Sequence, residues 1–344
     1  MKTIYSEDHR LQAGQSELID GKLLPCFEQP VRAELILQRV REVGLGEVLA
    51  PEEFGREPLA RVHHARFLDF LEGAWDAWVA AHGDYDALPI NWPIRGFRSD
   101  REPTAIDGKL SYFSFDAGTP VTAGTWRAAC QSANVALTGQ RLLAAGERAV
   151  FSLCRPPGHH AGADYYGGYC FLNNAAIAAQ ACLDQGAGRV AILDIDYHHG
   201  NGSQSVFYQR PEVGFASIHG DPRQEFPYFL GYADESGAGP GEGYNWNYPL
   251  PWDTVADTWF AALHDACGRL RDYGPEVLIV SLGVDTFRED PISRFRLDSE
   301  DFRRVGASIA ALARPTLFVM EGGYAVAAIG INAVNVLTGF EAGR

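Results

Sequence analysis

Short runs of apolar residues recur along the chain and alternate with longer stretches of helical periodicity. The apolar runs predict buried strands at residues 3–5, 149–154, 190–195, 213–218, 277–282 and 316–320. Apolar positions at helical spacing predict helices at residues 173–185, 255–273 and 301–313, and an earlier helical block at about residues 32–82. Strands that are apolar throughout and separated by helices are typical of a parallel sheet. The pattern therefore predicts one α/β domain over residues 1–344, with a central, mostly parallel β-sheet flanked by helices on both faces.

Two long segments lack this alternation. Residues 83–124 contain four prolines and no sustained period, and residues 219–254 are rich in glycine and aromatic residues. Loops of this length inside an α/β domain are usually functional. The density of aromatic residues in the second segment favours a wall of a binding pocket over a neutral surface insertion.

Composition and charge exclude several classes of protein. The chain has 46% hydrophobic residues, enough for a sizeable core, and no apolar run of membrane-spanning length. Its first residues become charged before an apolar signal segment forms, so we expect a cytoplasmic protein. A net charge of −15 argues against a nucleic-acid partner and suits a cationic ligand. The six cysteines are scattered, which is typical of buried thiols and not of disulfides or a cysteine zinc site.

Polar residues gather directly after the predicted strand at residues 190–195, in the sequence LDIDYHHGNG. Successive side chains of an extended segment alternate sides, so Asp194, Asp196 and His198 face one way. His199 faces the other way, and we expect it only to support the site. A carboxylate and an imidazole two residues apart are able to bind one metal ion from a strand end.

A third potential ligand follows a different strand. Asp285 comes after the run at residues 277–282, which is apolar except for one serine. Two carboxylates and one imidazole suit a divalent ion with an open coordination position, as in catalytic zinc sites. A single aspartate at a strand end is more often a helix cap than a ligand. The interpretation therefore depends on whether several strand ends converge.

Two further predicted strands end in reactive side chains. His159 and His160 follow a Pro-Pro-Gly turn, and Tyr324 follows two glycines. In an open α/β sheet, ligands bind beyond the carboxyl ends of the strands. Four such endings in one sheet favour an active site over four unrelated polar residues.

These motifs, in order and spacing, resemble the zinc-dependent histone deacetylase superfamily with its arginase-like fold. The motifs are RPPGHHAG, GGYCFLNNAAIAA, LDIDYHHGNG, SIHGDP, SLGVDTF and EGGY, and the similarity covers nearly the whole chain. The segments YSEDH, SLCRPPGHHAG and VSLGVDTF are similar in particular to bacterial acetylpolyamine amidohydrolases. The resemblance implies a deacetylase of small cationic acetylated amines. Deacetylation of acetyl-lysine peptides or other small acetamides is the alternative.

The resemblance also implies roles for individual residues. Asp196, His198 and Asp285 match the ligands of one catalytic zinc ion per subunit, and Tyr324 matches the catalytic tyrosine. The tandem catalytic histidines and the residues behind them are His159, His160, Asp194 and Asn201. A structural potassium ion is implied at Asp194, Asp196, His198, Ser217 and Ile218.

The substrate channel is less completely matched. Its implied residues are Tyr169, Phe226, Glu17, Asp107, Asp116 and Gly323. Glu17 and Asp107 match two acids of a pattern at the channel mouth, and a third acid of that pattern aligns with Gly118, two residues from Asp116. Residues 83–124 align with an insertion that shapes the channel and the dimer interface in the polyamine branch, so we expect a homodimer.

Two other functions fit the sequence less well. A binuclear manganese ureohydrolase of this fold needs the arrangement D-x-H-x-D, and here Gly200 stands at the last position. A non-catalytic polyamine sensor would typically lose the tyrosine or a metal ligand. This chain retains all of them.

Overall fold

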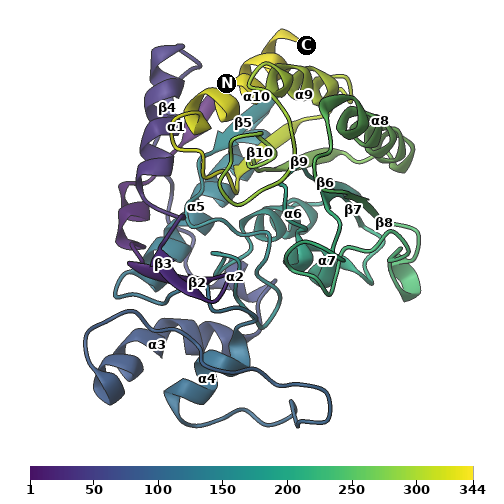
Figure 1. Cartoon of the computed structure of the whole chain (residues 1–344). Helices are drawn as coiled ribbons and strands as arrows, with labels where there is room; N and C mark the ends of the chain where they lie inside the picture. The colour runs from purple at the N-terminus through teal and green to yellow at the C-terminus, as the bar shows by residue number, and fades with distance from the viewer. Residues whose placement is uncertain (344) are drawn as a thin grey trace.

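Eight strands form the central sheet of the protein, whose computed structural model describes residues 1–343 (Figure 1). The strands are β1 (Lys2–Ile4), β4 (Val48–Leu49), β5 (Ala149–Ser152), β6 (Val190–Asp194), β7 (Val213–Gly220), β8 (Asn245–Leu250), β9 (Val277–Leu282) and β10 (Thr316–Met320). Their order is β4-β1-β5-β10-β9-β6-β7-β8, and every neighbouring pair is parallel. The parallel α/β fold predicted from the sequence is therefore confirmed.

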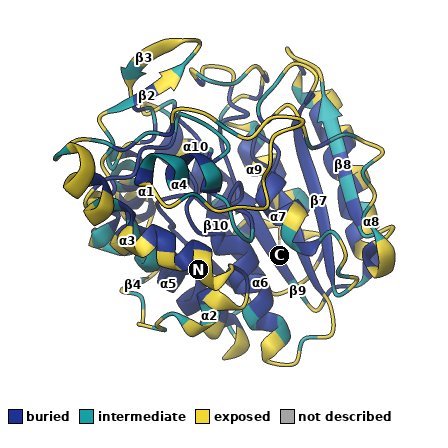
Figure 2. Cartoon of the chain, turned by 90° about the horizontal axis from the view of Figure 1, so that it is seen from below, coloured by how far each residue is buried: buried dark blue, intermediate teal, exposed yellow. Residues whose placement is uncertain are grey.

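Helices cover both faces of this sheet, and Figure 2 shows the buried strands between helices with exposed outer sides. The helices are α1 (Val31–Glu42), α2 (Glu57–Ala60), α3 (Ala65–His82), α4 (Ile106–Phe113), α5 (Thr125–Ala144), α6 (Asn174–Asp184), α7 (Asn201–Phe207), α8 (Ala256–Tyr273), α9 (Asp301–Ala310) and α10 (Ile329–Ala342). One hydrophobic core lies between the sheet and α1, α8, α9 and α10, and the other contains α3, α4, α5 and α6. In β6, Ala191 and Leu193 enter the first core while Val190 and Ile192 enter the second. This alternation explains why the strand is apolar throughout.

The six predicted strands all occur, with bounds shifted by at most a few residues, but two predicted loops contain regular structure. The edge strand β8 lies within residues 219–254, and α4 lies within residues 83–124. In β8 the polar Asn245 and Asn247 are buried, with their side chains donating to Gln204 Oε1, and the aromatic Trp246 and Tyr248 between them are only partly buried. It therefore lacks the apolar run that marks the central strands.

A small antiparallel hairpin stands apart from the main sheet, formed by β2 (Ser16–Ile19) and β3 (Lys22–Pro25). Its turn residues Asp20 and Gly21 both have positive φ, 53° and 72°, as a tight two-residue hairpin requires. The backbone N–H of Leu18 donates to the carbonyl of Ala117, 3.3 Å away. This bond ties the hairpin to residues 83–124. Within residues 1–343, no helix has the combination of length and apolar character needed to cross a membrane.

Candidate metal centre and active site

Three ligand-type side chains meet beyond the ends of the neighbouring strands β6 and β9. Asp196 and His198 follow β6, and Asp285 follows β9. One potential ligand atom from each lies within 4.8 Å of the others. His198 Nδ1 is 3.0 Å from Asp285 Oδ2 and 3.5 Å from Asp196 Oδ1. The structure thus brings together the three residues that the sequence proposes as metal ligands.

The surroundings of these three side chains fit a bound cation. All three are buried, and burial together with the negative charge of Asp196 raises the pKa of Asp285 to about 8. A divalent cation between the two carboxylates would offset this repulsion. Backbone N–H groups of Tyr197 and Gly322 donate to Asp285 Oδ1 and Asp196 Oδ2, over 2.7 and 2.8 Å. The carboxylates are therefore already oriented, and two oxygens and one nitrogen are a suitable donor set for zinc.

Gly322 is required for this arrangement. A Cβ atom at this position would lie 2.5 Å from Asp196 Oδ2 and 2.7 Å from Asp285 Oδ2. Any larger residue would therefore displace the carboxylates. The motif EGGY, which has little meaning alone, thus supplies space as well as Tyr324.

The tandem histidines lie beside the three ligands, with ring centroids 4.0 Å apart. His159 Nδ1 donates to Asp194 Oδ2 over 2.9 Å, and His160 Nδ1 donates to Asn201 Oδ1 over 2.6 Å. Burial lowers the pKa of His159, but the charges of Asp194 and Asp196 outweigh it and raise that pKa to about 10. Burial, and then the two neighbouring histidines, hold the pKa of His160 well below its usual value. His159 therefore keeps its proton. His160 is neutral, and its Nε2 is free to accept a proton.

Tyr324 is held by contacts that the sequence does not reveal. The backbone N–H groups of Tyr324 and Ala325 donate to Asp290 Oδ2, over 2.7 and 3.2 Å. The Arg32 guanidinium lies 4.7 Å from the centre of the tyrosine ring. Arg32 also donates to the carbonyl of Gly323 over 2.6 Å. Asp290 lies in the loop after β9, and a polar residue in a loop gives no sign of which backbone groups it will bind.

Glu321 is a second residue missed from the sequence. It is fully buried, and its Oε2 accepts the backbone N–H groups of Gly158 and His159, over 2.6 and 3.2 Å. Its Oε1 accepts the hydroxyl of Ser281 over 3.2 Å. Glu321 thereby joins the turn that presents the tandem histidines to the strands β9 and β10.

A cavity of about 540 Å³ leads from the surface to this site. His160, His198 and Tyr324 lie among its lining residues at the base, and Tyr169 and Phe226 form part of its wall. The Phe226 ring is 5.2 Å from that of His160 and 6.1 Å from that of His198. The Tyr169 ring is 5.5 Å from that of Tyr324. Both predicted channel aromatics thus contact residues at the base of the cavity.

The acids predicted at the channel do not all reach this cavity. Asp116 is among the lining residues, but its carboxylate accepts the backbone N–H groups of Gly118 and Gly168. Glu17 is fully buried and is not among the lining residues, although its neighbours Leu18 and Ile19 are. Its Oε1 accepts the N–H of Phe27, and burial raises its pKa to about 7.

Asp107 and Gly323 are also absent from the lining of the cavity. Asp107 is 3.0 Å from His82 Nε2, so it contacts helix α3. Gly323 lies behind Tyr324, where it accepts the hydrogen bond from Arg32. Glu17 in β2, Asp107 in α4 and Gly323 are thus not among the lining residues, although the sequence proposes them for the channel, because sequence spacing does not determine how the hairpin and α4 are oriented toward the cavity.

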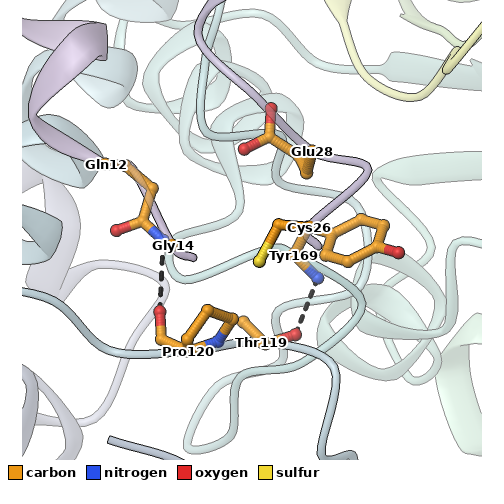
Figure 3. A pocket seen from close by; sticks show the side chains of 7 residues that line it. All are labelled: Gln12, Gly14, Cys26, Glu28, Thr119, Pro120 and Tyr169. Atoms are coloured by element: carbon orange, nitrogen blue, oxygen red, sulfur yellow. Dashed lines mark hydrogen bonds between the residues drawn. The ribbon is translucent and has the colours of Figure 1, made fainter. Parts of the chain in front are cut away.

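A second, much smaller cavity lies behind Tyr169 (Figure 3). Its volume of about 10 Å³ is enough for about one water molecule. Tyr169 has a positive φ of 66°, and its backbone N–H donates to Thr119 Oγ over 2.8 Å. The side chains drawn around it are those of Gln12, Gly14, Cys26, Glu28, Thr119, Pro120 and Tyr169. This packing fixes one wall of the channel.

The residues proposed for potassium lie on β6 and β7 and in the turn after β6. Asp194 is the register partner of Ser217, and Ile218 is the next, buried residue of β7. His199 is buried on the other side, and its Nδ1 is 3.3 Å from Ser217 Oγ. The supporting role expected for His199 stays a prediction.

The fold and the site define the class of the protein. Residues 26–340 match the family model described as histone deacetylase domain, so the chain belongs to the histone deacetylase family and is a deacetylase, an amidohydrolase.

The most informative relatives belong to one branch. The chain is 64% identical to acetylpolyamine amidohydrolase 2 of Pseudomonas aeruginosa, over 99% of both chains. It is 52% identical to acetylpolyamine amidohydrolase of Mycoplana ramosa, over 98% of this chain and 99% of that one. The crystal structure of acetylpolyamine aminohydrolase from Burkholderia pseudomallei matches with a TM-score of 0.95 and 39% identity, over 100% of this chain and 99% of that one. The family predicted from the motifs is confirmed.

Proposed function

We propose that the protein is a zinc-dependent amidohydrolase that removes the acetyl group from acetylated polyamines such as acetylputrescine, acetylcadaverine or acetylspermidine. The observation that carries this proposal is the buried group Asp196, His198 and Asp285 at the base of an aromatic-walled cavity. The similarity to proteins named acetylpolyamine amidohydrolases supports the choice of substrate. An acetamide on a slender methylene chain suits a channel between Tyr169 and Phe226.

Each residue of the site has a separate role in amide hydrolysis. Asp196, His198 and Asp285 would hold one zinc ion, which when bound polarises the acetyl carbonyl and lowers the pKa of a water molecule to about 7. His160, neutral and with Nε2 free, takes the proton of the attacking water and passes it to the leaving amine. Tyr324 donates its phenolic hydrogen bond to the carbonyl oxygen as negative charge develops there. His159, protonated and paired with Asp194, adds positive charge beside that oxygen.

Two further features belong to this proposal. A structural potassium ion at Asp194, Asp196, His198, Ser217 and Ile218 is consistent with the pairing of β6 and β7 behind the site. Homodimer formation through residues 83–124 is supported by the exposure of Ile90, Ile94 and Phe97, by 74, 63 and 67%. Large apolar side chains this exposed commonly mark an interface. Measuring the mass in solution tests the dimer.

A substrate panel tests the proposed function. Purified zinc-loaded protein is assayed for kcat/KM on acetylputrescine, acetylcadaverine, acetylspermidine and an acetyl-lysine peptide. We expect the acetylated polyamines to be preferred, and a chelator to abolish activity until zinc or cobalt is restored. Faster turnover of the peptide, or activity that chelators do not affect, would contradict the proposal.

A further inference from the structure

Glu225 is a carboxylate in the wall of the large cavity, directly before the channel residue Phe226. Its Oε2 accepts the hydroxyl of Tyr197 over 2.7 Å and the indole N–H of Trp252 over 3.1 Å. Its Oε1 accepts the backbone N–H of Phe226 over 3.1 Å. Three hydrogen bonds therefore fix the carboxylate, and all three donors are neutral.

The charge of Glu225 has no counter-ion in the part of the chain that the structure describes. No ion pair within residues 1–343 includes this carboxylate. Arg294 also lines the cavity, but it stacks on Trp252, with its guanidinium carbon 5.1 Å from the ring centre. A hydrogen-bonded carboxylate without an ion-pair partner in a cavity wall is suited to a cationic ligand.

The other acids around the cavity are less suitable. The Asp116 carboxylate is engaged by Gly118, Thr119 and Gly168, and its pKa is raised by burial. Asp20 lies exposed at the tip of the β2–β3 hairpin. Position 118, where the related pattern has an acid, is a glycine and carries no charge. Glu225 is therefore the acid best placed to act inside the cavity.

Glu225 is also tied to the candidate metal centre through a single residue. The backbone N–H of Tyr197 donates to Asp285 Oδ1, and its hydroxyl donates to Glu225 Oε2, each over 2.7 Å. One tyrosine side chain thus separates a candidate metal ligand from the Glu225 carboxylate. Glu225 and His198 line the same cavity, so a methylene chain with its acetamide beside His198 can carry an ammonium group toward this carboxylate.

We infer that Glu225 determines substrate specificity by binding the free ammonium group of the acetylated amine. The exposed rings of Tyr228 and Trp252, which line the same part of the cavity, add faces on which an ammonium group is attracted. This inference rests on the proposed function, since it concerns how the proposed substrate is held.

The test compares a cationic amide with a neutral one of the same shape. N-pentylacetamide replaces the ammonium group of acetylputrescine by a methyl group. The Glu225→Gln variant keeps the length of the side chain and an acceptor oxygen but removes the charge. We expect the ratio of kcat/KM for acetylputrescine to kcat/KM for N-pentylacetamide to fall at least about tenfold in this variant, mainly through KM, because a hydrogen bond to a charged group is lost.

Two further variants sharpen the test. Asp234→Asn removes the same charge from an exposed site in the same segment and should leave the ratio unchanged. Glu225→Asp keeps the charge and should retain most of the preference for acetylputrescine. Turnover of N-pentylacetamide reports an intact site in each variant.

Three outcomes would overturn the inference. In the first, Glu225→Gln lowers kcat/KM for both amides equally. Glu225 would then support the wall of the cavity and not bind the ammonium group. In the second, Asp234→Asn lowers the ratio of kcat/KM values as much as Glu225→Gln does. The effect would then come from the net charge of the protein and not from Glu225 in particular. In the third, Glu225→Asp loses the preference although it keeps the charge.

If the unmodified protein itself shows no preference for acetylputrescine, the proposed polyamine substrate is wrong as well, and this result is distinct from the other three.

Discussion

The base and the mouth of the large cavity are built in different ways. At the base, His160, His198 and Tyr324 are buried, follow the ends of parallel strands, and are held by hydrogen bonds to buried neighbours. At the mouth, Tyr228 and Trp252 are 48 and 41% exposed and come from a long segment outside the central strands. The sheet therefore fixes the reacting groups, while loops supply the groups that meet the rest of the substrate. Changes at the base should affect the reaction itself, and changes at the mouth should affect which substrate is chosen.

Loss of a candidate metal ligand should have the largest effect. Asp285→Ala removes one of the three ligands and should reduce kcat by more than about 10³-fold, with loss of bound zinc. Metal analysis and an acetylputrescine assay on the same sample measure both changes. Asp272→Ala, at an exposed site, is the control and should keep both properties. An Asp285→Ala protein that retains one zinc per chain would remove Asp285 from the ligand set.

Loss of the oxyanion donor should be the next largest effect. Tyr324→Phe should reduce kcat by roughly 10²–10³-fold, the usual effect of removing one such donor, while zinc content stays the same. Steady-state kinetics separate kcat from KM, and Tyr208→Phe, away from the cavity, serves as the control. A near-normal kcat would disprove the role of the Tyr324 hydroxyl.

A buried histidine outside the cavity, His63, should also make the fold sensitive to acid. His63 Nδ1 donates to the carbonyl of Gly162 over 2.8 Å, and its Nε2 accepts the N–H of Asn173 over 3.0 Å, so the folded protein needs the neutral ring. Burial lowers the pKa of His63 to about 4. Because this pKa is below that of an unfolded histidine, the stabilisation is complete above about pH 6.5 and is lost as the pH falls toward 4.

The size of this acid effect follows from the same shift. Between pH 7 and pH 5, His63 should contribute a loss of roughly 2 kcal/mol in the free energy of unfolding. Chemical denaturation at both pH values measures it. His63→Gln should reduce this difference, whereas the exposed His264→Gln should not. An unchanged difference in His63→Gln would show that other groups cause the acid sensitivity.

The smallest effect is expected at the outer mouth. Phe229 is 84% exposed and is not among the lining residues of the large cavity. Phe229→Ala should change kcat/KM by less than about twofold and the free energy of unfolding by less than about 0.5 kcal/mol. A tenfold loss of kcat/KM would mean that Phe229 contacts the substrate although it is not among the lining residues of the cavity.

The same distinction explains what could be predicted from the sequence. Strands β9 and β10 were predicted with their observed bounds, because central strands are buried on both faces and are apolar throughout. The hairpin β2–β3 and the long helix α5 were not predicted. Helix α5 buries small and polar residues such as Ser132 and Asn134 as well as apolar ones, so its sequence shows little contrast between faces.

The site follows the same rule. Asp196, His198 and Asp285 could be grouped in advance because parallel strands deliver their carboxyl ends to one edge of the sheet. Glu225 and Asp290 could not be assigned to the site in advance. Each lies in a loop whose position is set by contacts with residues that are distant in the sequence. The family motifs identify the reaction, but they do not say which loop acid faces the substrate.

The most direct test of the central claim is to locate the metal itself. Crystals of the zinc-loaded protein measured at the zinc absorption edge should give one strong anomalous peak, within bonding distance of Asp196, His198 and Asp285. A peak instead at the other buried group, His159, Cys170 and Glu321, would contradict the claim. So would stoichiometric zinc with no peak between Asp196, His198 and Asp285.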